Sequence, residues 1–411
     1  YLTQMEEHGI EPTYAQLREA WMSHVKERVW AANRQALTLM HAGHYPPVTG
    51  SKKFNSQWSQ IDPQLVNEIW AFTAPGMLDY AVEKSRFAAK ITNDDFGIEP
   101  TLVYAAMYSS AFFESDVHKL VDIGQNVLPE GSHFSKAMDR VKELYATYPD
   151  DWKAARQAIK VEYYDAADHN PYAWMPIDAT LNGALGILAL LYGDGDIQKT
   201  LDFSCAFGMD ADNQAASMVG LVAITTGLEG IPKELLYPLE HADWELPFND
   251  SYKMITREVL TDAGLTEMAE RMAAQGEKII LSKGGSIVDI EGEAHYKIPV
   301  NAEFIPPFEF NIREQFHVET GKAFEYPLYV GGAANSTLSI TQSNSDKIKI
   351  ADGMLKADFD SADTYSLTIT ARNEDNELSR NLTFIVHRKN LAHDPTRQTD
   401  PLLADGDIYE T

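Results

Sequence analysis

Residues 205–227 read CAFGMDADNQAASMVGLVAITTG, which places a cluster of polar side chains between two apolar segments. An apolar segment, made up of residues 181–192 and then 201–206, precedes the cluster, and the small-residue segment 214–226 follows it. Both flanking segments have the length and composition of buried helices. The polar cluster between them, called the acidic turn below, consists of Asp210, Asp212 and Asn213.

Carboxylates enclosed between packed helices are costly to desolvate unless a partner neutralises them. Asp and Asn oxygens suit the hard cations Mg²⁺ and Mn²⁺ better than Zn²⁺. We therefore predict a Mg²⁺ or Mn²⁺ site with Asp210 and Asp212 as ligands and Asn213 as a third. The alternative is that these residues only cap the helix that begins near Gln214. One capping residue would suffice for that role, which favours a metal site.

The composition limits the possible partners of the chain. Its 411 residues carry 61 acidic against 34 basic side chains, a net charge of −27, which argues against nucleic acid or an anionic membrane surface. No stretch is long and apolar enough to span a bilayer. The single cysteine, Cys205, excludes an intrachain disulfide and a cysteine-based zinc cluster, and its apolar surroundings predict a buried, inert thiol.

Residues 1–275 read as helices joined by polar loops. Helices are predicted over residues 60–74, with Asp62 as the cap, over 77–91 and over 101–113. Four acidic residues beside these helices are candidates for a general base or for sugar contacts, although each is equally well explained as a helix cap or as solvated surface. They are Asp62, Asp94, Asp95 and Glu99. Aromatic side chains in the loops could stack on a sugar or base, or could cover the core instead; they are Phe96, Tyr172 and Trp174.

The residue pattern of the sequence changes after about residue 275. Residues 276–300 are interpreted as a linker, with room for a hairpin of their own. From residue 301 to 390, short runs alternate β-branched or aromatic residues with polar ones, which predicts a small all-β sandwich. Strands are expected over residues 304–310, 324–330, 338–341, 348–350, 365–372 and 382–387. Residues 391–411 are predicted to be a polar, poorly ordered tail.

A family resemblance rests first on the acidic turn. The segment GMDADNQAA at residues 208–216 resembles the C-terminal metal motif of the ADP-ribosylglycohydrolase family, usually Gly-Gly-Asp-Thr-Asp-Thr before a small-residue helix. Other segments are similar to the same family, and the resemblance spans roughly residues 1–250. These segments are residues 182–189, 191–193, 227–232, 60–62 with Pro75 and Gly76, and 92–97 leading into an Ala-Ala-Met helix.

The resemblance implies an all-α domain that holds two Mg²⁺ or Mn²⁺ ions, which grip the ribose hydroxyls of an ADP-ribosyl group. It implies metal-binding and catalytic roles for Asp210 and Asp212, with Asn213 standing where a threonine ligand is usual. Two departures stand out. The family's Asp-Asp-Thr type motif is absent from this sequence, which starts just after the motif's expected place, so that either the motif lies outside this sequence or the protein carries half a site. In addition, Asn93 occupies a position where relatives often have His. The residues implied in substrate binding are Asp62, Asn93, Asp94, Asp95, Phe96, Gly97, Glu99 and Asn182.

The expected function is metal-dependent hydrolysis of a glycosidic bond in a small-molecule or glycan substrate with a ribose-like sugar. Two alternatives remain: a glycoside hydrolase that acts on glycans with a carboxylate pair, and a non-catalytic sugar-binding or adhesion protein on a degenerate glycohydrolase fold. The C-terminal segment resembles bacterial immunoglobulin-like modules of the cadherin-like type, which are usual on secreted proteins. We therefore expect a secreted or periplasmic location.

Overall fold

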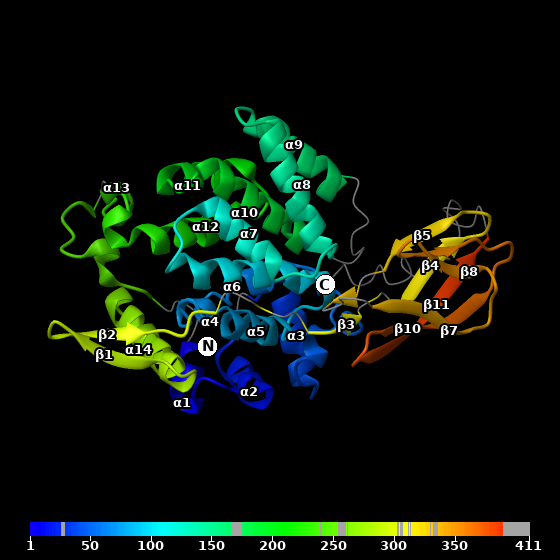
Figure 1. Cartoon of the computed structure of the whole chain (residues 1–411), viewed down its shortest axis with the longest axis horizontal. Coiled ribbons are helices and arrows are strands. Elements are labelled where there is room, and N and C mark those ends of the chain that lie inside the picture. The colour runs from blue at the N-terminus through cyan, green and yellow to red at the C-terminus, as the bar shows by residue number, and fades with distance from the viewer. Residues whose placement is uncertain are drawn as a thin grey trace. The chain divides into compact units, whose positions relative to one another are not determined.

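The computed structural model describes residues 1–25, 29–165, 175–238, 241–253, 260, 262–301, 304, 307–310, 312, 314–328, 330–331 and 336–388. The chain divides into two compact units, residues 1–305 and residues 306–411 (Figure 1). The first is helical and the second is all-β, which confirms the predicted fold class. Tyr172, Trp174 and the tail 391–411 lie outside the described residues.

The described part of the helical unit contains helices α1 to α14. Their bounds are α1 Leu2–His8, α2 Tyr14–His24, α3 Ala31–His41, α4 Ile69–Phe72, α5 Leu78–Ala89, α6 Glu99–Ala111, α7 Val117–Asn126, α8 His133–Thr147, α9 Trp152–Lys160, α10 Ala179–Gly193, α11 Ile197–Phe207, α12 Ala211–Thr226, α13 Lys233–Leu236 and α14 Leu265–Ser282.

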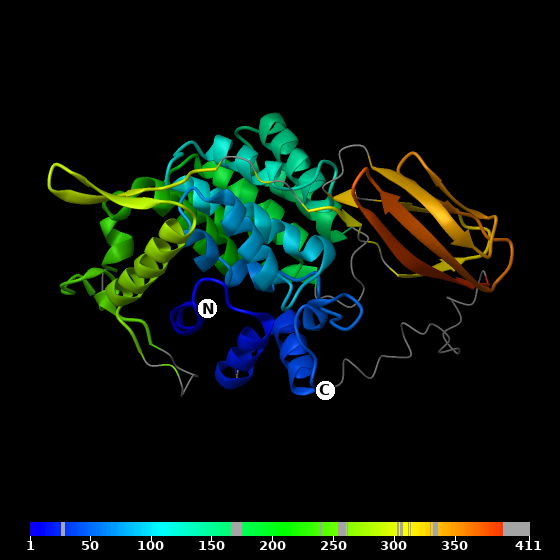
Figure 2. The ribbon, with the colours of Figure 1, turned by 60° about the horizontal axis from the view of Figure 1, so that its bottom comes forward.

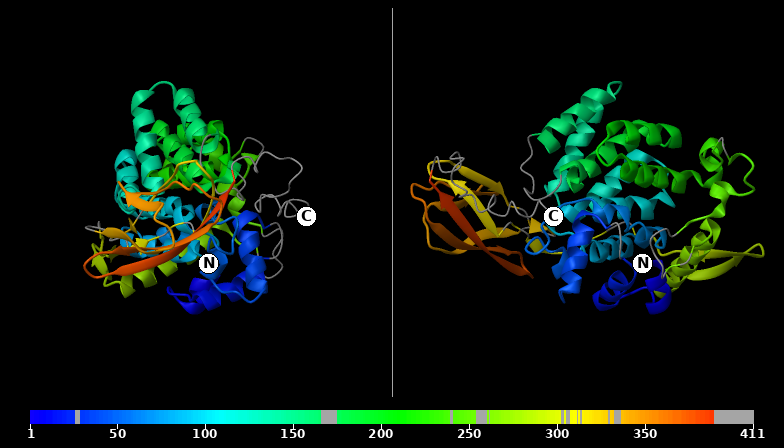
Figure 3. Two further views of the ribbon diagram at one scale, coloured as in Figure 1. Left: turned by 90° about the vertical axis from the view of Figure 1, so that its right-hand side faces the viewer. Right: turned by 180° about the vertical axis from the view of Figure 1, so that it is seen from behind.

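Helix α10 lies at the centre of the helical unit. Every residue from Ala179 to Leu191 is buried, as expected for a helix that is apolar on all sides. It packs against α6, α8, α11 and α12, and Figure 3 shows α10 to α12 side by side. Because α11 and α12 follow α10 directly in the sequence, the acidic turn between α11 and α12 is anchored on the most buried helix of the unit.

The segment 60–74 differs from the single helix that was predicted. It forms a 3₁₀ turn, Asp62–Leu65, followed by the short helix α4, and the Asp62 side chain caps neither. Long-range contacts explain the break: the backbone N–H of Ile61 donates to the carbonyl of Ile177, and the Asn67 amide donates to the carbonyl of Ser85. These contacts fix the segment against the start of α10 and against α5.

Residues 276–300, interpreted as a linker from the sequence, group with the helical unit. They hold the end of α14 and a two-stranded hairpin, β1 Ser286–Ile290 paired with β2 Glu293–Lys297, which projects beyond α14 (Figure 2). Cys205 also differs from its prediction, because it is exposed: α11 turns Ser204 and Phe207 inward and Cys205 outward. Among the described helices, none has both the length and the apolar content needed to cross a membrane.

In the described part of the C-terminal unit, the strands form a four-stranded sheet, a three-stranded sheet and the short antiparallel pair β3–β6. The strand order is β4-β11-β10-β7 in the first, where β4 runs parallel to β11, and β5-β9-β8 in the second. Inward-facing residues such as Phe316, Leu367 and Phe384 share one core. Strands β4 and β9 were not predicted. The bounds are β3 Glu309–Phe310, β4 Gln315–Glu319, β5 Phe324–Pro327, β6 Val330–Gly331, β7 Thr337–Ser343, β8 Ile348–Ala351, β9 Met354–Ala357, β10 Thr364–Arg372 and β11 Glu377–His387.

Candidate functional site

The acidic turn has an unusual backbone. Gly208 and Met209 both have positive φ, 73° and 61°, so the chain reverses sharply before α12 begins. Asp210 stands at the N-cap position of α12, yet its side chain makes no capping hydrogen bond. Capping therefore does not account for the Asp210 carboxylate. A strained turn that presents a carboxylate without a capping role is typical of a functional site.

Asn182 on α10 holds the acidic turn in place. Its Oδ1 accepts hydrogen bonds from the backbone N–H of Asp210 (3.0 Å) and from Nε2 of Gln214 (2.9 Å). Gln214 Nε2 also donates to the carbonyl of Gly208 (3.2 Å). Asn182 and Gln214 are buried. Asn182 thus positions Asp210 through the backbone and does not itself line the pocket described below.

Asp210 and Asp212 form a carboxylate pair. Partial burial raises the pKa of Asp210 to about 6, and the neighbouring charge of Asp212 and a side-chain hydrogen bond between the two add to the rise. Asp212 is exposed. Two carboxylates this close favour either a shared proton or a bound cation.

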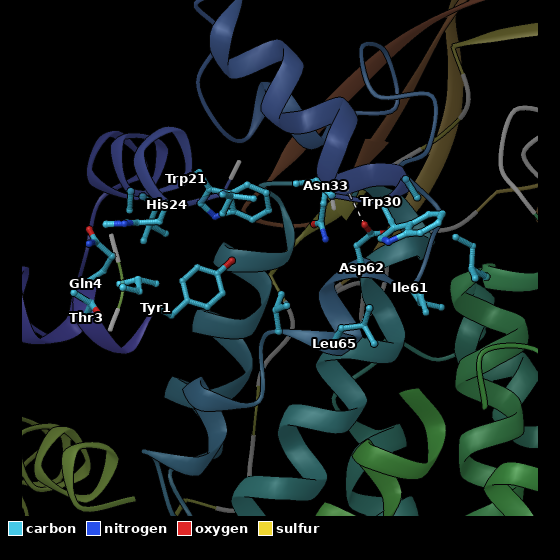
Figure 4. A pocket seen from close by; sticks show the side chains of 18 of the residues that line it. Tyr1, Thr3, Gln4, Trp21, His24, Trp30, Asn33, Ile61, Asp62 and Leu65 are labelled. Atoms are coloured by element: carbon cyan, nitrogen blue, oxygen red, sulfur yellow. Dashed lines mark hydrogen bonds between the residues drawn. The ribbon is translucent and has the colours of Figure 1, made fainter. Parts of the chain in front are cut away.

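Asp62, from a distant part of the sequence, lines the same pocket as Asp210 and Asp212. Its side chain is 3% exposed, and its Oδ1 accepts a hydrogen bond from the backbone N–H of Asn33 (2.9 Å). Burial raises the pKa of Asp62 to about 7, and the nearby charge of Asp210 contributes to the rise. In Figure 4, the Asp62 carboxyl points to the start of α3, where Asn33 and Trp30 flank it.

One pocket of about 660 Å³ connects these acidic groups. Asp62, Asp210 and Asp212 all line it, together with apolar walls that include Trp21 and Trp30 (Figure 4). A volume of this size accommodates a small-molecule ligand. The pocket therefore brings together two elements that are about 150 positions apart in the sequence.

Asn213 is placed differently from its two acidic neighbours. It is buried on the first turn of α12, its Oδ1 lies 3.4 Å from the hydroxyl of Ser217, and it does not line the pocket. Within the part of the chain that is described, no three His, Cys, Asp or Glu side chains are arranged as a metal-binding group. The donor chemistry of the Asp210–Asp212 pair nevertheless suits a hard divalent cation, since both groups offer carboxylate oxygens.

The predicted substrate residues 93–97 form a separate structure and do not line the pocket. Asn93 donates through its amide to the carbonyl of Gln60. Asp94 accepts from the backbone N–H groups of Lys52 and Asp95, and the Asp95 carboxylate pairs with Lys52 Nζ (2.9 Å). The Asn93 amide N–H and the two carboxylates are thus engaged by neighbouring backbone and by Lys52, whereas the buried Asn93 Oδ1 has no hydrogen-bond partner among the described residues.

Two other members of this loop serve packing. The ring of Phe96 stacks on His133 (4.2 Å between centroids) and meets Trp58 edge-on (4.7 Å). Gly97 lies so close to the Trp58–Ser59 backbone that an added Cβ would clash with the Trp58 carbonyl and approach Ser59 Cα to 2.9 Å. Position 97 therefore requires glycine for steric reasons.

We expect Gly97→Ala to destabilise the protein by about 1–3 kcal/mol, because the backbone of residues 58–59 must move to admit the methyl group. Thermal unfolding measures the change. Gly220→Ala is the matched control: an added Cβ meets nothing within 4 Å inside α12, so helix propensity should stabilise this variant by about 0.5–1 kcal/mol. Equal melting temperatures for the two variants would refute the steric explanation.

Glu99 is buried below this loop and caps another helix. Its Oε2 accepts hydrogen bonds from the backbone N–H of Phe134 (2.6 Å) and from the hydroxyl of Ser132 (3.1 Å), at the start of α8. Burial raises the pKa of Glu99 to about 8. Glu99 is therefore a structural acid that is neutral in the folded protein at pH 7, and it does not line the pocket.

We expect Glu99→Gln to flatten the pH dependence of the unfolding free energy. Between about pH 5 and 8 the folded protein keeps the Glu99 proton while the unfolded chain, with the ordinary value of 4.5, has lost it. Stability of the wild type therefore falls as pH rises, by about 1.4 kcal/mol per pH unit for one proton. Urea unfolding at a series of pH values measures the slope, with exposed Glu229→Gln as the control. Parallel profiles for wild type and Glu99→Gln would contradict this.

Asn33 and Trp30 are among the pocket residues that were not predicted from the sequence. Asn33 and Trp30 lie at the start of α3, beside Asp62, but no local motif marks them. Their position beside Asp62 follows only from the long-range hydrogen bond between the Asn33 backbone N–H and the Asp62 carboxylate.

Comparison with known proteins adds one informative match. The model of the ADP-ribosylglycohydrolase family matches residues 2–275, two thirds of the chain. No curated protein matches. A crystal structure from Bacteroides fragilis, provisionally named an alpha-galactosidase, is 14% identical over 20% of this chain and 17% of that one, with a TM-score of 0.18. So small an overlap carries no argument about fold or function.

Proposed function

Because this chain belongs to the ADP-ribosylglycohydrolase family, we propose that it hydrolyses a glycosidic bond in the pocket lined by Asp62, Asp210 and Asp212. The family match supports a glycohydrolase-type function and implies a small-molecule glycosyl substrate. The observation that carries the proposal is the meeting of the Asp210–Asp212 carboxylate pair, in which Asp210 caps no helix, and a third, buried carboxyl in one pocket of about 660 Å³.

We assign the Asp210–Asp212 pair to Mg²⁺ or Mn²⁺. The support is the chemistry of the donors: two touching carboxylates, one of them with its pKa raised to about 6 by burial and by its neighbour. A bound divalent cation would orient the sugar through its hydroxyls and polarise the reacting centre. Asn182 keeps the pair in position through the backbone of Asp210.

Asp62 is assigned as the general base. Its buried carboxyl, with a pKa of about 7, exchanges a proton near neutral pH, which suits general acid–base catalysis. As the carboxylate, Asp62 accepts a proton from water while the water oxygen bonds to the anomeric carbon. In the same step the bond from that carbon to the leaving group breaks, and the leaving group takes a proton from solvent. The hydrogen bond from Asn33 orients Asp62 for this step.

The substrate is assigned as a ribose-like glycoside of the ADP-ribosyl type, and the protein is assigned to a secreted or periplasmic location. The family match supports the first. The second is supported by the resemblance of the C-terminal sequence to immunoglobulin-like modules. Glycan hydrolysis and sugar binding without cleavage are the competing functions.

A substrate panel tests the proposal. ADP-ribosylated peptides and 4-nitrophenyl glycosides are incubated with the full chain in Mg²⁺, Mn²⁺ or EDTA. We expect release of ADP-ribose that depends on the cation and stops in EDTA. Hydrolysis of nitrophenyl glycosides alone would favour a glycoside hydrolase that acts on glycans. Hydrolysis of neither class would overturn the enzymatic proposal.

A further inference from the structure

The start of α3 forms a distinct part of the pocket wall. Trp30 stands at the N-cap position, Ala31 follows with a φ of 42°, and Asn33 lies on the first turn. A positive φ is uncommon for a residue with a Cβ and is retained where the surroundings fix it. Trp30, Ala31 and Asn33 all line the pocket, so this strained turn presents its side chains there.

Asn33 has two separate roles at this turn. Its backbone N–H donates to Asp62 (2.9 Å), which leaves the side chain free for other contacts. The side-chain Oδ1 is buried and finds no hydrogen-bond partner among the described residues. Buried acceptors of this kind are normally satisfied, so an unmet one in a pocket wall indicates a ligand group that donates to it.

Trp30 is exposed to an unusual degree. Its side chain is 67% exposed although it lines a pocket, and Figure 4 shows it beside Asp62. A large aromatic ring left open in a pocket is a binding surface rather than a core residue. The indole face can pack against the apolar C–H face of a sugar ring.

We propose that Trp30 and Asn33 form a sugar-binding subsite beside Asp62, in which the indole stacks on an uncharged sugar ring and Asn33 Oδ1 accepts a hydrogen bond from a ring hydroxyl. The proposal rests on the glycohydrolase function above and names the part of the pocket that binds the sugar.

The pattern of acceptors favours a sugar over a purine. Asn33 and Asp62 are neighbours in the pocket wall, joined by the backbone hydrogen bond, and the Asn33 Oδ1 and the Asp62 carboxylate are both acceptors. Two neighbouring acceptors match two neighbouring donors, which is what adjacent sugar hydroxyls provide. The edge of adenine presents a donor next to an acceptor and satisfies only one of them.

Equilibrium binding tests the subsite without requiring hydrolysis. Methyl β-D-ribofuranoside, methyl α-D-galactopyranoside, methyl α-D-glucopyranoside and adenine are titrated into the full chain in EDTA. Binding is followed by saturation-transfer NMR and by protection of tryptophan fluorescence from acrylamide. We expect at least one glycoside to bind, with its affinity at least about tenfold weaker in Trp30→Ala and in Asn33→Ala.

The variants are chosen to keep the fold intact. Asn33→Ala retains the backbone N–H that binds Asp62, and Trp30 is largely exposed. Trp30→Phe should retain part of the affinity, whereas Trp244→Phe, outside the pocket, should bind like wild type. Unchanged affinity in both Trp30→Ala and Asn33→Ala would overturn the subsite, as would binding of adenine with no glycoside bound. Sugar binding without any hydrolysis would sustain the subsite while refuting the proposed function.

Discussion

Asp212→Ala is expected to lower kcat/KM for the glycosidic substrate about 10³-fold and to abolish the response of activity to Mg²⁺ or Mn²⁺. A bound divalent cation supplies several kcal/mol of charge stabilisation at the reacting centre, and each 1.4 kcal/mol corresponds to a factor of ten in rate. Asp210 alone would leave one carboxylate for the cation. Isothermal titration of Mn²⁺ into wild type and variant measures the binding step separately from the chemistry.

The position of Asp212 makes this a clean experiment. Its side chain is exposed on the first turn of α12, so its removal leaves no cavity in the core. Removing one member of the pair also relieves the repulsion that helps to raise the pKa of Asp210, so the fold should not be weakened. Asp202→Ala, which removes an exposed carboxylate from α11 outside the pocket, is the matched control. Equal Mn²⁺ affinity in wild type and Asp212→Ala would exclude this pair as the cation site.

Local patterns were sufficient to predict the scaffold of the site. The apolar run before the acidic turn predicted α10, which is buried almost throughout, and the small-residue segment after it predicted α12, which is buried along part of its surface. Asp210 and Asp212 are only two positions apart, so their closeness follows from the sequence alone. The C-terminal strands with clear alternation, such as β10 and β11, were also predicted from their period.

The rest of the site depends on contacts that no local pattern encodes. Asp62 was predicted either as a helix cap or as a candidate site residue, and no local pattern identified its partner, Asn33, which lies 29 positions earlier. Residues 93–97 were grouped with the site through a family resemblance, yet their side chains bind the neighbouring backbone and Lys52. A carboxylate beside a helix start shows the same local sequence pattern whether it caps the helix or lines a pocket. Only the tertiary packing separates Asp62, which reaches the pocket, from Asp94, which does not.

Asp62→Asn is expected to reduce kcat at least about 100-fold while making the protein more stable at pH 7 to 8. The loss of rate follows from the loss of a general base, which contributes about 10²–10⁴ in rate. The gain in stability follows from burial: the folded pKa is about 7 and the ordinary value is 3.8. Between those values the folded state keeps a proton that the unfolded chain has released, so wild-type stability falls as pH rises. Asparagine never ionises and removes that cost, and it still offers an acceptor to the Asn33 N–H.

Asp178→Asn provides a matched control because Asp178 is also buried and its pKa is also raised to about 7 by burial. It caps α10 through the N–H groups of Thr180 and Leu181, asparagine preserves that cap, and it does not line the pocket. Urea unfolding in EDTA, which removes any stabilisation by bound cation, should show both variants gaining stability at pH 7 to 8. Only Asp62→Asn should lose activity. If both variants retained kcat, burial of the Asp62 charge would lower stability without contributing to catalysis. The general base would then have to be another group in the pocket.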